Sequence, residues 1–206
     1  MRDLARQSGS LTTVLLLVCC LSLNVLASDQ PTRYDGQWWL SISERQRVGY
    51  VRGFSICYLE LVDRTAFDGG SLRLYSTSLT TYLQNHPESR SESAESILLK
   101  VNKLLPKQKS SSSPPNETPE ELAAKWGAND DGDDWRGPDM FQLGYVQGFL
   151  ECYSKHTRLE YGTFSRTPKW YVDAIANWYG TGPDPEQLNP SREKTRIPEV
   201  LFRFHD

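Results

Sequence analysis

The chain has 206 residues, of which 38% are hydrophobic and 11% aromatic, and its formal net charge is −3. This composition can bury a core, while the slight acidity and the absence of zinc-finger, basic-zipper or RNA-binding signatures argue against a nucleic-acid partner. Phosphate-loop, dinucleotide-binding, nucleophile-elbow and zinc-protease motifs are absent from the sequence as well.

The N-terminus has the pattern of a secretory signal peptide over residues 1–27. Arg2 and Arg6 give a basic start, an apolar stretch follows, and Val25 and Ala27 suit the −3 and −1 positions of a cleavage site. A retained membrane anchor is the alternative, but the apolar stretch is shorter than the ~20 residues of a spanning helix. We expect cleavage, export to the periplasm or the medium, and no membrane span afterwards.

A ten-residue segment occurs twice, as GYVRGFSICY from Gly49 and as GYVQGFLECY from Gly144. Such a period indicates one structural unit used twice. We therefore expect a first helical repeat over residues 28–105 and a second over residues 135–206. The low-complexity and acidic stretch between them, residues 106–134, is expected to be a flexible linker.

Each repeat should contain three helices, because the apolar spacing is helical throughout and shows no period of two. The predicted ranges are 41–62, 71–85 and 94–101 in the first repeat and 138–156, 168–179 and 198–204 in the second. Ser41 and Glu44 read as a capping box at the start of the first helix. The predicted fold class is all-α, with the two repeats packed about a pseudo-two-fold axis.

Small residues spaced by four form a stripe on the first helix of each repeat. The stripe contains Gly49, Gly53, Gly144 and Gly148. Such a stripe lets two helix backbones come close together, and the polar residues around it favour packing in a soluble core over a membrane.

Cys57 and Cys152 occupy the same position in the two repeats and are the pair that remains after removal of residues 1–27. In an oxidising compartment such a pair is a candidate disulfide. The alternative is two small buried residues that never meet.

No residue set predicts a catalytic site, a cofactor or a metal. The acidic run 129–134 fails the EF-hand template, and the histidines lack zinc-ligand spacing. His156 lies four residues after Cys152, but the first repeat has no matching histidine, so structural use of the cysteine is favoured. Glu60 and Glu151 could be proposed as a glycosidase pair, yet they do not occupy equivalent positions.

The tryptophans exceed what a bare helical core requires, which suggests an aromatic surface for a peptide or a glycan. The candidates are Trp38, Trp39, Trp135, Trp170 and Trp178. The alternative is that these large rings fill space inside the core.

The order of motifs in the first repeat resembles the Rap/Tai family of type VI secretion immunity proteins, which are exported helical proteins with an HdeA-like fold. The resemblance rests on GYVRGF from Gly49, YLQNHPE from Tyr82 and SAESILLKV from Ser93. It implies a helical fold and a cell-wall-targeting toxin as partner. The chain departs from the family in its tandem pattern and in lacking the family's internal cysteine pair, so no inhibitory residue is carried over.

The sequence thus predicts an exported, non-enzymatic helical protein that binds a protein partner, with toxin inhibition as the activity that the resemblance implies. Two alternatives stay open. One is a periplasmic stress or chaperone-like protein, and the other is a cell-wall or glycan hydrolase with carboxylates in an aromatic groove.

Overall fold

The computed structural model describes residues 34–67, 70–106, 135, 139–157, 163–182, 192 and 194–205. The predicted signal peptide lies outside these residues, and so does the predicted linker apart from Pro106. In the described parts the regular structure is helical, apart from one isolated bridge between Asp35 and Ser93, which confirms the all-α fold class. None of the helices described there combines the length and the apolar character needed to cross a membrane.

All six predicted helices are present, and two further elements, α2 and η1, were not predicted. In chain order the elements are α2 (Gly36–Ser41), α3 (Glu44–Leu61), α4 (Leu72–Asn85), the 3₁₀ helix η1 (Pro87–Ser91), α5 (Ala94–Leu104), α7 (Asp139–His156), α8 (Pro168–Trp178) and α9 (Ile197–Arg203). Below, "first half" means residues 34–106 and "second half" means the described residues from 135 onward.

The start of α3 corrects the sequence prediction. Ser43 caps this helix, since its hydroxyl oxygen accepts the backbone N–H of Gln46 at 3.2 Å. Ser41 instead ends α2, where its hydroxyl donates to the carbonyl oxygen of Trp38 at 2.7 Å. The capping box of Ser41 and Glu44 is therefore wrong, because a separate short helix uses the residues as far as Ser41.

That short helix exists because Asp35 caps it. One carboxylate oxygen of Asp35 accepts the backbone N–H groups of Gln37 at 3.0 Å and Trp38 at 2.8 Å. These bonds satisfy N–H groups that have no partner inside a first turn. The other end of α2 is held by Arg47 of α3, whose guanidinium donates to the carbonyl oxygens of Trp39 and Leu40.

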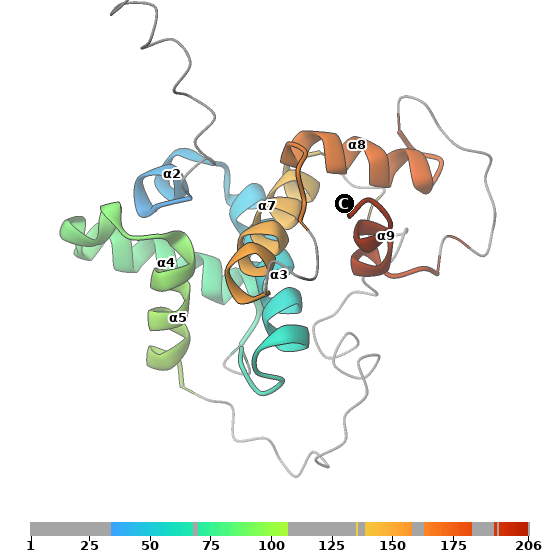
Figure 1. Ribbon diagram of the computed structural model, residues 1–206. Coiled ribbons are helices and arrows are strands. Elements are labelled where there is room, and N and C mark those ends of the chain that lie inside the picture. Colours follow the sequence, from blue (N-terminus) through green and yellow to red (C-terminus); the bar gives the residue numbers. More distant parts are fainter. Residues whose placement is uncertain are drawn as a thin grey trace, which may run out of the picture. The chain divides into compact units, whose positions relative to one another are not determined.

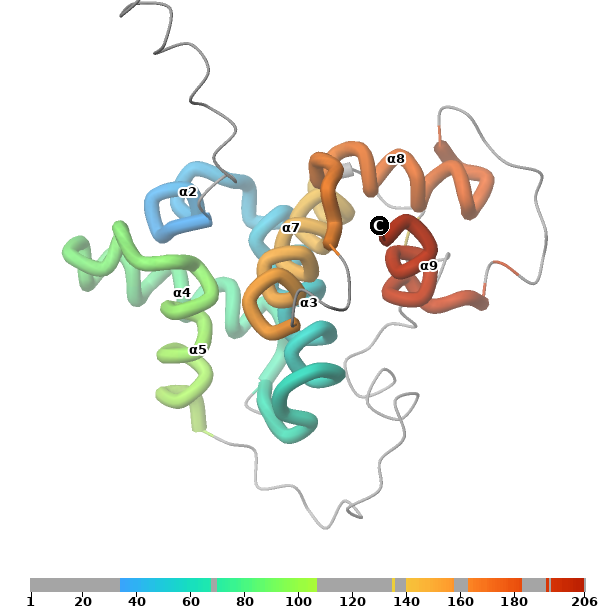
Figure 2. Tube along the Cα trace, viewed as in Figure 1, coloured from blue at the N-terminus to red at the C-terminus, as the bar shows by residue number. Residues whose placement is uncertain are grey.

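The centre of the fold is the α3–α7 pair, with α4 and α5 on one side and α8 and α9 on the other (Figures 1 and 2). The two helices touch along the predicted glycine stripe. A Cβ atom at Gly49 would collide with the carbonyl oxygen of Phe141, and one at Gly53 with that of Tyr145. Only glycine at these positions allows the observed approach of the two backbones.

The same contacts recur with the roles of the two helices exchanged. A Cβ atom at Gly144 would collide with the carbonyl oxygen of Gln46, and one at Gly148 with that of Tyr50. Gly144 and Gly148 stand 95 positions after Gly49 and Gly53, and Phe141 and Tyr145 stand 95 positions after Gln46 and Tyr50. Each contact therefore has a reciprocal one across the interface.

Candidate functional site

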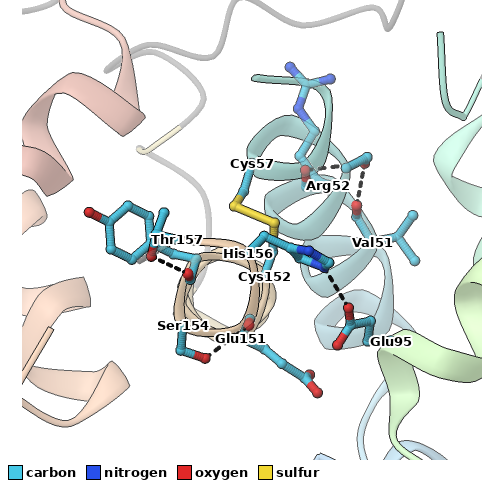
Figure 3. The surroundings of a disulfide bond; sticks show 11 residues. Val51, Arg52, Cys57, Glu95, Glu151, Cys152, Ser154, His156 and Thr157 are labelled. Atoms are coloured by element: carbon cyan, nitrogen blue, oxygen red, sulfur yellow. Dashed lines mark hydrogen bonds and ion pairs between the residues drawn. A yellow bond between two sulfur atoms is a disulfide. The ribbon is translucent and has the colours of Figure 1, made fainter. Parts of the chain in front are cut away.

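Cys57 of α3 and Cys152 of α7 form a disulfide with their Cα atoms 6.1 Å apart (Figure 3). Both residues are fully buried. The bond joins the two central helices beyond the glycine contacts. It also removes Cys152 as a nucleophile beside His156, because the reactive form of cysteine is a free thiolate.

A group of polar side chains lies where the start of α5 meets the end of α7. We call Glu95, Glu151, Lys155 and His156, together with Tyr50 of α3, the polar cluster. Glu95 accepts a bond from Lys155 Nζ at 2.5 Å. It also pairs with His156 Nε2 at 2.7 Å (Figure 3). Glu151 accepts bonds from Lys155 Nζ at 2.8 Å and from the Tyr50 hydroxyl.

Local structure explains why these side chains converge. Glu151 and Lys155 are four residues apart on α7, so they share one face of the helix. Glu95 is in the first turn of α5, where a carboxylate complements the helix dipole. The carboxylate side chains of Glu95 and Glu151 are only 9% and 7% exposed, whereas Lys155 is 41% exposed. The lysine is thus the more exposed of the two partners of Glu95, since the His156 side chain is 26% exposed.

Burial shapes the electrostatics of the cluster. It raises the pKa of Glu151, because the bonds from Lys155 and Tyr50 offset the loss of hydration only in part. Burial also raises the pKa of Tyr50 well above its ordinary value, and the charge of Glu151 adds to this. For Lys155 burial acts to lower the pKa, but the bonds to Glu151 and Glu95 outweigh it and the net shift is upward.

Tyr34, just before α2, borders the same cluster. Burial is the main cause that raises the pKa of Tyr34 to about 12, and the charge of Glu151 adds to it. Its ring lies 4.7 Å from that of Trp38, and its carbonyl oxygen accepts the backbone N–H of Ala94 at 2.6 Å. The start of the described chain is therefore fastened to the first turn of α5, beside the cluster.

All four carboxylate oxygens of Glu95 and Glu151 bind side chains of the protein itself. Such a cluster ties α3, α5 and α7 together and has its acid–base groups engaged internally. Of the pair considered for glycosidase chemistry, Glu60 binds Arg196 at 2.7 Å, whereas Glu151 binds Lys155 and Tyr50, so the two carboxylates share no partner among these contacts. Among the described residues, no group of three or more histidine, cysteine, aspartate or glutamate side chains could hold a metal ion.

The predicted aromatic surface needs correction at two of its five positions. Trp39 and Trp135 are core residues with exposed fractions of 0% and 1%. The Nε1 atom of Trp39 donates to the hydroxyl of Thr80 at 3.0 Å. Their large rings fill the space beside the central helices, which was the alternative that the sequence left open.

Trp38 and Trp178 are partly buried and are engaged within the fold. The ring of Trp38 packs on Tyr34. The indole of Trp178 has the guanidinium of Arg192 at 4.0 Å and that of Arg203 at 4.5 Å from its centroid. These stacked cations cover ring surface that would otherwise meet a ligand.

Trp170 is the candidate that stays exposed, at 42%, and it has an aromatic neighbour that the sequence prediction missed. Its ring centroid lies 5.8 Å from that of Phe204, the partly buried residue that follows α9. We call Trp170 and Phe204 the aromatic surface. The prediction named tryptophans alone, whereas a phenylalanine near the C-terminus was the signal that could have completed it.

Comparison of the chain with protein-family models, with curated proteins and with solved structures gives no match.

Proposed function

We propose that this is an exported, non-enzymatic protein that binds a protein partner through its aromatic surface. The observation that carries the proposal is the exposed indole of Trp170 on α8, with Phe204 beside it. Tryptophan is enriched among the residues that dominate the binding energy of protein interfaces, because it buries a large rigid surface. An exposed indole with an aromatic neighbour is therefore a candidate anchor.

Export is supported by the disulfide between Cys57 and Cys152, because such bonds persist in oxidising compartments. The signal-peptide pattern of residues 1–27 points the same way. A non-enzymatic role is supported by the polar cluster, whose carboxylates are engaged by the protein's own side chains. The resemblance of the first repeat to type VI secretion immunity proteins makes a cell-wall-targeting toxin our proposed partner.

We also propose that the two halves are related by a pseudo-two-fold axis that passes near the disulfide. The reciprocal glycine contacts support it, since the contact between Gly53 and Tyr145 is matched by the one between Gly148 and Tyr50. The disulfide supports it as well, because the two cysteines hold corresponding positions, 95 residues apart.

The first half offers a matched control for the aromatic surface. Leu74 occupies on α4 the position that Trp170 occupies on α8, since each precedes a fully buried tyrosine, Tyr75 or Tyr171. Leu74 is 41% exposed, almost the same as Trp170. Alanine at either position removes an equally exposed side chain, but only one of the two changes removes the proposed anchor.

The test is capture of partners from the native cell envelope with the tagged wild-type protein, the Trp170→Ala variant and the Leu74→Ala variant. We expect one partner in stoichiometric amount with the wild type and with Leu74→Ala. Trp170→Ala should weaken its binding by roughly 30-fold, the effect of losing one anchor residue. Titration calorimetry with the purified partner gives the two affinities.

Other results would overturn the proposal in different ways. Equal affinities of the three proteins for one partner would place the interface away from α8. A spread of unrelated captured proteins would favour the chaperone-like alternative. Release of sugars or peptides from purified cell wall by the wild-type protein would favour the hydrolase.

A further inference from the structure

Each central helix forms an ion pair with the start of the last helix of the other half, and the two central helices contribute opposite charges. Lys155 of α7 binds Glu95, in the first turn of the last helix of the first half, at 2.5 Å. Glu60 of α3 binds Arg196, which precedes the last helix of the second half, at 2.7 Å. Lys155 stands 95 positions after Glu60, as Cys152 does after Cys57. The same place in the two halves therefore carries opposite charges.

Backbone packing alone does not explain why the first half pairs with the second. The glycine contacts are reciprocal, so α3 of another copy of the chain would offer α3 the same glycines, carbonyl oxygens and cysteine that α7 offers. An equal half from a second molecule could thus take the place of the unlike half. Something outside the glycine stripe has to distinguish the two arrangements.

We propose that the Glu95–Lys155 and Glu60–Arg196 pairs determine which halves associate, favouring unlike halves and opposing association of equal halves from two copies of this chain. Specificity of this kind needs a repulsive element against the wrong partner as well as an attractive one for the right partner. Both elements follow from the opposite charges. The inference rests on the pseudo-two-fold relation and is independent of the aromatic surface.

Association of two first halves would be opposed most strongly. Glu60 would stand where Lys155 stands now, against Glu95. His156, the other partner of Glu95, would be replaced by Leu61, which lies 95 positions earlier. A carboxylate that is 9% exposed would then lose both of its partners and face a like charge, and an unpaired buried charge is strongly destabilising.

Association of two second halves meets the converse problem. Lys155 would stand where Glu60 stands now, against Arg196. The side chains of Glu60 and Arg196 are 33% and 30% exposed, so water screens this repulsion more than the one at Glu95. Association of two first halves is therefore opposed more strongly than association of two second halves.

The test exchanges the two charges that occupy the corresponding positions. The purified exported chain, which lacks residues 1–27 and with them Cys19 and Cys20, keeps the wild-type net charge when it carries Glu60→Lys and Lys155→Glu. It places like charges between unlike halves and opposite charges between equal halves. Equal amounts of ¹⁴N- and ¹⁵N-labelled protein are reduced, unfolded, mixed and oxidised together in a glutathione buffer. Mass spectrometry then measures the ratio of Cys57–Cys57 to Cys57–Cys152 peptides, and mixed labels identify bonds between molecules.

In the wild type we expect the Cys57–Cys152 peptide to dominate. In the exchanged variant the ratio should rise by about tenfold, the effect expected when a few partly exposed ion pairs change sign. Because both proteins have the same linker and concentration, the advantage of pairing within one chain cancels from the comparison. A control with Glu60→Gln and Lys155→Gln removes the charges without reversing them and should give an intermediate ratio.

A rescue variant adds Glu95→Lys and Arg196→Glu to the exchanged chain, which restores opposite charges between unlike halves. It should bring the ratio back close to the wild-type value, with the remaining difference due to the like charge that Lys155→Glu places beside Glu151 on α7. An unchanged ratio in the exchanged variant, or a rescue variant that behaves like it, overturns the proposal. If the exchanged variant does not fold, the rescue variant decides, since folded protein with a ratio close to the wild-type value supports the proposal and failure to recover it overturns it.

Discussion

In each half one phenylalanine from the segment after the central helix packs against three rings at corresponding positions. These rings are Phe54, Tyr58 and Tyr75 around Phe67, and Phe149, Tyr153 and Tyr171 around Phe164. Phe67 is fully buried, whereas Phe164 is only partly buried. The same aromatic framework is therefore closed to solvent in the first half and partly open in the second, beside the aromatic surface.

The hydrogen bonds of the buried tryptophans also differ between the halves, again in favour of the first half. The indole nitrogen of Trp39 donates to Thr80, whereas the buried indole nitrogen of Trp135, which also packs beside its central helix, has no hydrogen-bond partner within the described structure. Unpaired buried donors cost free energy. We therefore expect the first half, in which this buried donor is satisfied, to be the more firmly held.

The largest expected effect comes from breaking the covalent link that the halves share. Replacing Cys57 and Cys152 together by serine releases a loop with a sequence separation of 95. The free energy of unfolding should fall by about 4.5 kcal/mol, because the unfolded chain regains that loop entropy. Urea unfolding of the variant and of the reduced wild type measures the loss, and unchanged midpoints in both would contradict a stabilising bond.

Truncating the two equivalent phenylalanines tests the difference in closure. Phe67→Ala should cost about 4 kcal/mol of unfolding free energy, and Phe164→Ala about 2 kcal/mol, because the latter ring is already partly hydrated. Urea unfolding of both variants gives the comparison. Equal losses would show that the two halves are equally closed in solution.

For the glycine stripe we expect equal losses of stability in the two halves. Gly53→Ala and Gly148→Ala should each lower the free energy of unfolding by about 3 kcal/mol, because each new methyl group meets a backbone carbonyl of the opposite helix. Thr77→Ala on the exposed side of α4 is the control, and it should change stability by less than about 0.5 kcal/mol. Unequal costs at the two glycines would weaken the reciprocal relation between the halves.

The smallest expected effect is a pH dependence of stability that arises from Glu151, a position at which the two halves differ. Glu151 corresponds to Ile56, which does not titrate. Because burial raises the pKa of Glu151 in the folded state, its protonation contributes stability that is fully present below the ordinary carboxyl pKa. That contribution is lost as pH rises through the raised pKa.

Glu151→Gln should remove this dependence. Relative to the variant, the wild type should therefore lose stability as pH rises from the acidic side through the raised pKa of Glu151. Thermal unfolding from pH 4 to pH 8 measures the difference between the two proteins. Parallel stability curves would mean that Glu151 has the same affinity for protons in the folded and unfolded states.

Local patterns sufficed to predict the six main helices, because their apolar spacing and their caps lie within a few residues of each other. The predicted range 71–85 differs from α4 only by its cap residue, Ser71. The prediction failed at Ser41, where the serine–glutamate spacing was satisfied but Asp35 had already started another helix. Competing caps cannot be ranked without the tertiary contacts that hold α2, such as those of Arg47.

Within the candidate sites, the glycine stripe was predictable because it depends on the internal repeat. The repeat also made Cys57 and Cys152 a candidate pair, but it left open whether they bond. The polar cluster was not, since Glu95 and His156 are 61 residues apart and belong to no common motif. The sequence also left open which tryptophans are exposed, because Trp39 and Trp170 are the same type of residue, yet the first is buried and the second is exposed.

The sequence by itself determined the helices, the repeated segment and the close approach of the two helix backbones, because periodicity and the absence of a side chain act locally. Only the tertiary structure decided which cysteines bond, which carboxylates are buried together and which indole faces solvent. Those outcomes depend on how α3 and α7 cross and on what α5 and α9 bring to their ends, so they arise from contacts between segments far apart in the chain.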